Sequence, residues 1–393
     1  MAVDTNQLME AFKNKHGESK HQARIFNAPG RVNLIGEHLD YNGGYVLPAA
    51  LEFGTTLIIR PRDDDKLSLA STNLAHTADI RLQHIGTKTE EWTDYPAGVI
   101  VELNKLGVTL SSGYDLLYHG DIPNGAGLSS SASLEVVTAY ALLSMEGKET
   151  DTVEIAKLSQ RAENQFVGVN SGIMDQFAVA NGRKDHAILL MCDTLEYELV
   201  PFQTGAYKLV IANTNKRRGL VDSKYNERRS ECDKALEILQ KEIPALSYLA
   251  QLNPQQFKDV RDSIKDETVS RRAQHVVEEN QRVLDSVKAL KDNDLEAFGQ
   301  YMNQSHDSLR HLYEVTGDEL DALVEEAQRI PGTLGSRMTG AGFGGCTVSL
   351  VHEDAVERFI EEVGRKYEAR TGLKADFYVC GVGHGVHEIK EGN

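Results

Sequence analysis

Apolar residues recur every three or four positions in several stretches of the chain, which is the spacing of a helix with one buried face. Residues 273–290 show this pattern over the longest distance. A second stretch, 320–327, is followed by Pro331-Gly332, which stops a helix. The same reasoning predicts helices near residues 96–106, 132–143 and 355–371, one that Asp151 caps, and one that starts at Asn253-Pro254.

Short continuous apolar runs alternate with these helices and predict buried strands. They cover residues 49–60, 67–71, 113–119, 187–191, 199–202, 208–212, 346–351 and 375–382. The first 70 residues are expected to form strands broken by turns. This order of strands and helices favours an α+β fold with two layered domains, over residues 1–200 and 201–393, although the composition marks no linker.

Composition narrows the classes of function. The 393 residues carry 42 basic and 59 acidic side chains, a formal charge of −17, which argues against a nucleic-acid-binding protein. No segment approaches the ~20 apolar residues of a membrane span, and the polar N-terminus does not resemble a signal peptide. The four scattered cysteines have no metal-ligand spacing and are expected to be reduced and mostly core-packed. We therefore expect a cytoplasmic protein without nucleic-acid or membrane partners, with a monomer favoured.

A glycine–serine loop over residues 123–133, PNGAGLSSSAS, precedes one of the predicted helices. Glycines let the backbone approach a ligand, and the free N–H groups at the start of the helix attract phosphate. The loop lacks the GK[ST] ending of a Walker A loop and does not fit a dinucleotide fingerprint. The alternative is a serine-capped helix after a flexible turn.

A second unusual segment, residues 28–44, places an arginine, two carboxylates and a histidine among four glycines. Apolar residues between 32 and 35 would anchor a short buried strand that Gly36 ends, leaving Glu37, His38 and Asp40 on a loop. Carboxylates suit sugar recognition because each accepts several hydroxyl hydrogen bonds. Arg31 could stabilise charge on a transferring phosphoryl group. The alternative is a surface loop with solvated charges.

Three motifs together carry a family resemblance. GRVNLIGEHLDYNGG (30–44) resembles the signature of the galactokinase family. PNGAGLSSSAS and LGSRMTGAGFGGC (334–346) resemble the second and third motifs of the wider superfamily of galacto-, homoserine, mevalonate and phosphomevalonate kinases. The resemblance implies a two-domain GHMP-kinase-like fold with the active site in the cleft between domains. It also implies ATP-dependent phosphorylation of galactose at the anomeric hydroxyl, which gives galactose 1-phosphate and ADP and brings galactose into metabolism.

The resemblance also implies roles for individual residues, and it adds Mg²⁺ to ATP and galactose as bound groups. Asp175 would be the catalytic base, and Arg31 would stabilise the transition state and the ionised aspartate. The other assignments are Glu37, His38, Leu39, Asp40, Gly172 and Tyr225 for galactose, Ser71, Gly125, Ala126, Gly127, Leu128, Ser129, Ser130 and Ser131 for ATP, and Ser131 and Glu163 for Mg²⁺. Two protein ligands suffice for Mg²⁺ because this ion keeps several waters.

Plain structural alternatives remain for several of these residues. Glu163 could be a helix-surface carboxylate, Tyr225 could pack beside a charged helix, and the assignment of Ser71 is the least specific. His306 and His311 are expected on a helix surface without a metal role.

Two rival functions also stay open. One is a kinase for a related sugar such as N-acetylgalactosamine. The other is a sugar-binding sensor that has lost catalysis, which the retained Ser131-Ala132, Asp175 and Arg31 disfavour.

Overall fold

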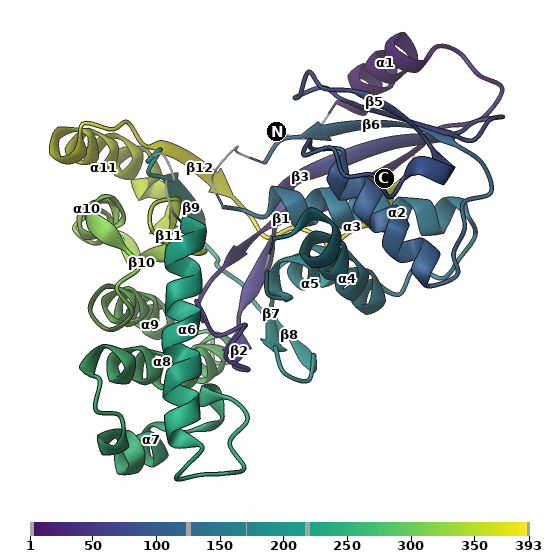
Figure 1. The fold of residues 1–393 in the computed structure, drawn as a ribbon. Coiled ribbons are helices and arrows are strands. Elements are labelled where there is room, and N and C mark those ends of the chain that lie inside the picture. The colour runs from purple at the N-terminus through teal and green to yellow at the C-terminus, as the bar shows by residue number, and fades with distance from the viewer. Residues whose placement is uncertain (1–3, 123–126, 170, 217–220, 391–393) are drawn as a thin grey trace.

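The structure is a computed structural model that describes residues 4–122, 127–169, 171–216 and 221–390, with the backbone alone described at 221–223. Its first lobe is built on a six-stranded sheet in the order β13-β1-β3-β6-β4-β5 (Figure 1). The strands are β1 (Arg24–Asn33), β3 (Pro48–Pro61), β4 (Lys66–Ser71), β5 (Ala78–Arg81), β6 (Tyr114–Gly120) and β13 (His387–Ile389). Only β4 and β6 pair in parallel, and the other pairs are antiparallel.

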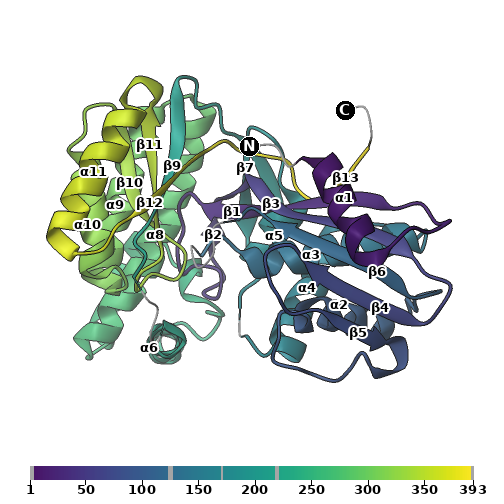
Figure 2. The same cartoon turned by 90° about the horizontal axis from the view of Figure 1, so that it is seen from above.

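Helices cover both faces of this sheet. The helices of this lobe are α1 (Thr5–His16), α2 (Asp94–Lys105), α3 (Ser130–Met145), α4 (Thr152–Arg161) and α5 (Met174–Asn181). Helix α3 packs on β1 and β3 and is surrounded by α2, α4 and α5, whereas α1 lies on the opposite face (Figure 2). Alternate residues of β3 divide between the two sides: Leu57 joins the main core, and Ile58 joins the cluster under α1.

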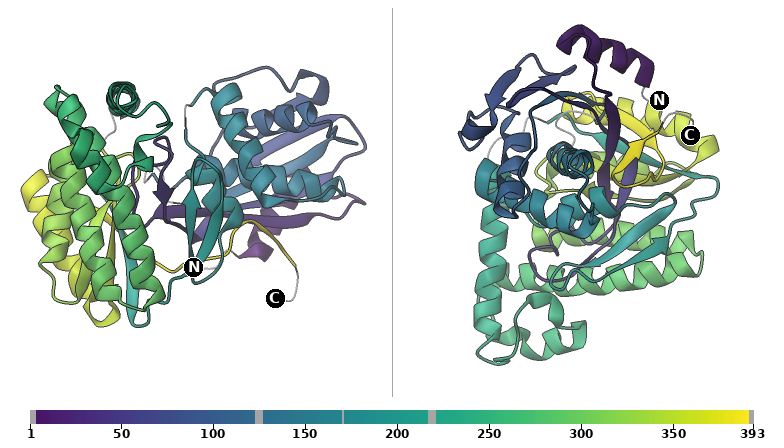
Figure 3. Two further views of the ribbon diagram at one scale, coloured as in Figure 1. Left: turned by 90° about the horizontal axis from the view of Figure 1, so that it is seen from below. Right: turned by 90° about the vertical axis from the view of Figure 1, so that its right-hand side faces the viewer.

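The second lobe is built on an antiparallel sheet in the order β10-β11-β9-β12. Its elements are β9 (Tyr207–Asn213), β10 (Thr333–Thr339), β11 (Cys346–His352), β12 (Asp376–Cys380), α6 (Val221–Leu239), α7 (Pro254–Val260), α8 (Glu267–Lys291), α9 (Leu295–Ser308), α10 (Gly317–Gln328) and α11 (Val356–Thr371). Leu209 and Ile211 of β9 face the core shared with α8 and α9. Val210 and Ala212 face α10 and α11, so the sheet is covered on both sides (Figures 2 and 3).

Smaller elements complete the described part of the chain. A three-stranded sheet has the order β2-β7-β8, and short helical turns complete the chain. Their bounds are β2 (Tyr45–Val46), β7 (His186–Met191), β8 (Tyr197–Pro201), η1 (Leu82–His84), η2 (Ala162–Val167), η3 (Leu249–Gln251), η4 (Arg261–Ser263), η5 (Leu309–Tyr313) and η6 (Glu353–Ala355). Among the described residues, no helix is both long and apolar enough to cross a membrane.

The end of the chain returns from the second lobe to the first. After β12, the N–H of Gly383 donates to the Ala50 carbonyl at 2.9 Å and the N–H of Val386 to the Val179 carbonyl at 3.0 Å. Strand β13 then pairs with β1 at the edge of the six-stranded sheet. A domain boundary near residue 200 stays a prediction.

Most predicted elements are present, with three corrections. The chain begins with helix α1 rather than with strands. Strand β1 is ten residues long and ends at Asn33, three residues before Gly36, although Leu34 and Ile35 are buried as expected. His306 is buried rather than on a helix surface, with its Nε2 3.2 Å from Asp321. Three of the four cysteines are buried, as predicted.

Candidate active site

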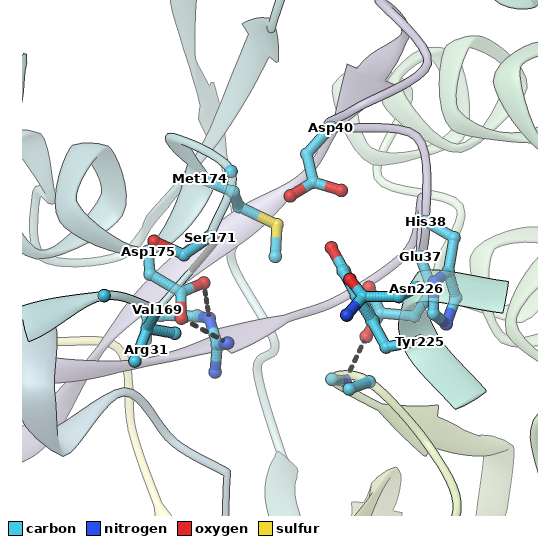
Figure 4. A pocket seen from close by; sticks show the side chains of 14 residues that line it. Arg31, Glu37, His38, Asp40, Val169, Ser171, Met174, Asp175, Tyr225 and Asn226 are labelled. Carbon is cyan, nitrogen blue, oxygen red and sulfur yellow. Dashed lines mark hydrogen bonds and ion pairs between the residues drawn. The ribbon is translucent and has the colours of Figure 1, made fainter. Parts of the chain in front are cut away.

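A cavity of about 400 Å³ lies where four segments meet (Figure 4). They are the start of α5, helix α6, the loop after β10, and the loop that follows β1 in the galactokinase signature (residues 30–44), here called the first-motif loop. The residues that line it are Arg31, Glu37, His38, Asp40, Gly168, Val169, Ser171, Gly172, Met174, Asp175, Tyr225, Asn226, Gly340 and Ala341. Segments from both lobes therefore contribute to one pocket. Seven residues predicted from sequence for sugar binding or catalysis are among them.

An ion pair between Arg31 and Asp175 forms one wall of this cavity (Figure 4). The guanidinium donates from Nε to Oδ1 at 2.8 Å and from a terminal nitrogen to Oδ2 at 2.9 Å, a bidentate contact. Arg31 is almost fully buried, whereas 28% of the Asp175 side chain is exposed toward the cavity. The pairing of β1 with β3 shifts register between Pro29 and Arg31, and such an irregularity can re-aim a side chain.

The glycine–serine loop is bound to this ion pair. Arg31 donates to the carbonyl of Gly127 at 2.7 Å, and its own N–H donates to the carbonyl of Leu128 at 3.1 Å. Ser129, held at a left-handed φ of 64°, donates its hydroxyl to Oδ2 of Asp175 at 2.5 Å. Asp175 is thus shared between the cavity and the predicted phosphate loop. The predictions for Gly125 and Ala126 lie outside the described residues.

Glu37 is buried against the third motif. It accepts a hydrogen bond from the Gly340 N–H at 2.5 Å and another from the Asn33 amide, and the Arg337 guanidinium lies 3.6 Å away. Burial raises the pKa of Glu37, while the charge of Arg337 and the bond from Asn33 act in the opposite direction. These contacts join the first-motif loop to the segment that follows β10.

His38 adopts a left-handed φ of 64° and is held by a row of hydroxyls. Its Nδ1 lies 2.9 Å from the Tyr41 hydroxyl, which lies 2.7 Å from the hydroxyl of Tyr313. Burial, assisted by the charges of His275 and Arg228, lowers the pKa of His38 to about 3. The imidazole is therefore neutral near pH 7.

Asp40 points into the cavity (Figure 4). Burial, followed by the negative charges of Asp175 and Glu37, raises its pKa to about 7. Gly172 packs directly against it, since a Cβ at position 172 would lie 2.0 Å from Oδ2 of Asp40. Only glycine fits there without moving the carboxylate.

Glu163 lies beside Asp175 in a second polar cluster. It accepts hydrogen bonds at Oε2 from the Ser171 hydroxyl and from the Gln176 amide, both at 2.7 Å. Burial raises the pKa of Glu163, and hydrogen bonds from Ser171 and Ser131 lower it. The structure thus brings Ser131 and Glu163 together, as the magnesium prediction requires. Among the described residues there is no group of three or more His, Cys, Asp or Glu side chains arranged for a metal.

Other predicted residues lie elsewhere. The side chains of Leu39 and Leu128 are buried in the hydrophobic core rather than in the cavity lining. Ser71 ends β4, and its hydroxyl accepts from the Asn73 N–H at 3.1 Å. Ser130 starts α3 and is exposed.

Several residues around the site were not predicted from sequence. Met174 and Asn226 line the cavity, and Tyr313 supports its loops. Ala341, which lines the cavity, and Arg337, which lies near Glu37, belong to the third motif but had no individual role predicted. Glu135 and Gln176 lie behind Glu163. A signal was present for Glu135, because it is a lone carboxylate in the apolar helix segment ASLEVVTAYALL.

Sequence comparisons agree with this architecture. The galactokinase galactose-binding signature matches residues 10–61, the GHMP kinase N-terminal domain matches residues 94–183, and the GHMP kinase C-terminal domain matches residues 286–369. Galactokinase of Fusobacterium nucleatum is 50% identical over 98% of this chain and 99% of its own length. Galactokinase of Halalkalibacterium halodurans is 52% identical over 94% and 93%.

Solved structures give the same result. Lactococcus lactis galactokinase complexed with galactose matches with a TM-score of 0.95 and 44% identity, over 98% of this chain and all of that one. A mevalonate kinase at 23% identity and a TM-score of 0.66 shares the fold. The chain belongs to the galactokinase family, within the GHMP kinases.

Proposed function

We propose that the cavity holds galactose and that the chain transfers the γ-phosphoryl group of ATP to the anomeric hydroxyl of the sugar, giving galactose 1-phosphate and ADP. The observation that carries this proposal is the position of Asp175. Its carboxylate faces the sugar-sized cavity and is bonded to Ser129 of the phosphate loop and to Arg31. A carboxylate in that position can contact both galactose and the transferred phosphoryl group of ATP.

In this reaction the anomeric oxygen of galactose bonds to the γ-phosphorus of ATP, and the bond between that phosphorus and the leaving ADP oxygen breaks. Asp175 accepts the proton of the anomeric hydroxyl. Oδ2 of Asp175 already accepts two hydrogen bonds and Oδ1 accepts one, so one lone pair of Oδ1 remains for the sugar hydroxyl. Arg31 supplies positive charge beside the transferred group. Glu37, His38, Asp40, Gly172 and Tyr225 would bind the sugar, as the galactose-bound relative of 44% identity supports.

Ser131 and Glu163 would hold Mg²⁺, and a hydroxyl with a carboxylate suits this hard cation. When bound, the ion neutralises charge on the β- and γ-phosphates. Residues 127–131, with Gly125, Ala126 and Ser71, would bind the nucleotide. A monomer in the cytoplasm stays a prediction.

The test is ADP release measured with a panel of sugars at saturating ATP. Galactose should give the highest kcat/KM, and turnover of only another sugar such as N-acetylgalactosamine would contradict the substrate assignment. Asp175→Ala should abolish turnover while galactose still binds in calorimetry. Arg31→Ala should lower kcat more than it raises the galactose KM, because its charge acts on the transition state. Full activity of Asp175→Ala would remove Asp175 from the mechanism.

A further inference from the structure

Two buried polar side chains behind Glu163 have no part in the mechanism above. Glu135 of α3 and Gln176 of α5 are both 0% exposed. The Gln176 amide nitrogen donates to Oε2 of Glu163 at 2.7 Å and to Oε2 of Glu135 at 3.4 Å. An amide nitrogen carries two hydrogens, so this one group can hold both carboxyls at once.

Packing does not explain why this cluster is polar. Glu135 lies in a helix whose other buried positions are mostly apolar, and a buried carboxyl costs free energy unless it is fully bonded. Oε1 of Glu135 and Oε1 of Gln176 have no hydrogen-bond partner among the described residues. Apolar side chains of similar volume would stabilise such a core at least as well.

The geometry constrains Glu163 instead. Ser171 and Gln176 donate to the same oxygen, Oε2, and so fix the plane of the carboxylate. The Ser131 hydroxyl also hydrogen-bonds to Glu163, so the two residues assigned to the cation already lie together at this carboxylate. Gln176 also follows Asp175 in the first turns of α5, so one helix end places both groups.

We propose that Gln176, anchored by Glu135, is a positioning residue that fixes the Glu163 carboxylate for the divalent cation. This inference rests on the proposed function, which assigns Glu163 to the cation. Groups that orient a metal ligand through hydrogen bonds commonly change metal affinity or activity by about 10–100-fold when they are replaced.

The test measures binding of ADP by calorimetry, first in EDTA and then across a Mg²⁺ titration. In the unaltered protein Mg²⁺ should tighten ADP binding at a defined half-effective concentration. In Gln176→Leu that concentration should rise about 10–100-fold, with ADP affinity in EDTA unchanged. Glu102→Gln is the matched control. It alters another buried carboxylate of the same lobe, bonded to Lys105 and Arg161, and should keep the original value.

A second pair of variants tests the anchor. Glu135→Gln keeps an acceptor oxygen for Gln176 and should behave like the unaltered protein. Glu135→Leu removes that oxygen and should raise the half-effective Mg²⁺ concentration about tenfold. Unchanged Mg²⁺ dependence in both leucine variants would overturn the inference. So would loss of ADP binding in EDTA, which would indicate a structural role. If Mg²⁺ does not tighten the binding of ADP to the unaltered protein but galactose is phosphorylated, the cation assignment fails while the kinase reaction stands.

Discussion

At the scale of single residues, Asp40 shows how burial can set the pH range over which the enzyme is active. Its pKa of about 7 arises mainly from burial and then from the charges of Asp175 and Glu37. Ionised Asp40 accepts hydrogen bonds from sugar hydroxyls at both oxygens, and protonation removes part of that capacity. We expect kcat/KM for galactose to be flat above about pH 7 and to fall below it, by up to about tenfold per pH unit. Initial rates at low galactose and saturating ATP measure this.

Asp40→Asn separates this group from its neighbours. The variant should have a lower kcat/KM for galactose and should lose the inflection near pH 7, because the amide does not titrate. An inflection that survives in Asp40→Asn would assign it to another group of the pocket. Gly172→Ala is unsuitable for this purpose, because the added methyl group would displace the same carboxylate.

The sequence identified the residues of the pocket better than it identified their supports. Arg31 and Asp40 stand in a segment whose glycines and charges are unusual locally, whereas the role of Asp175 followed from the family resemblance. Gln176 and Tyr313 have no such local signal, since the partners that they bond lie 13 and 272 residues away along the chain. Spacing along the chain carries no information about such contacts, so only the fold shows them.

At the scale of elements, helix α8 holds the first-motif loop in place. Glu279 of α8 accepts from the Gly36 N–H at 3.0 Å, the Ser305 hydroxyl at 2.5 Å and Arg282 at 2.8 Å. Burial alone would raise its pKa, but the charges of Arg282, His275 and Arg337 lower the pKa to about 2. The Glu279 carboxylate thus joins α8, α9 and the first-motif loop.

We expect Glu279→Leu to destabilise the protein by about 3–5 kcal/mol, because Arg282 and the Gly36 N–H would lose their partner inside the core. Urea unfolding measures this, and the galactose KM should rise with it. Glu278→Gln is the control on the same helix. Its carboxylate is 38% exposed and 3.7 Å from Arg282, so the expected loss is at most about 1 kcal/mol. Equal losses in the two variants would contradict the role given to Glu279.

Elements with a clear apolar stripe were predictable, and those with a polar buried face were not. Helix α8 follows its predicted pattern closely. Helix α9 was expected only around His306, and its buried face was misjudged because that face includes Ser305, His306 and Ser308 beside Phe298 and Met302. Helix α1 buries only Leu8 and Phe12, which is too few apolar positions to define a period.

At the scale of the whole molecule, the last segment of the chain connects the two lobes. It leaves β12 of the second lobe and bonds to β3 and α5 of the first. It then covers the outer edge of β1 as β13, where Glu388 pairs with Arg24 at 2.7 Å. The Val386 N–H donates to Val179 in α5, the helix that carries Asp175, so this segment also supports the active site.

Ending the chain after Val382 tests this connection. The truncation removes β13 and the backbone bonds from Gly383, Gly385 and Val386, and at about 1 kcal/mol per bond it should cost roughly 3 kcal/mol or more of stability. It also exposes the β1 edge, so the shortened protein should self-associate in light scattering, since an unpaired edge strand can pair with another chain. A protein that ends after Lys390 keeps β13 and is the control. Equal unfolding midpoints and equal scattering in the two proteins would show that the lobes hold together without this segment.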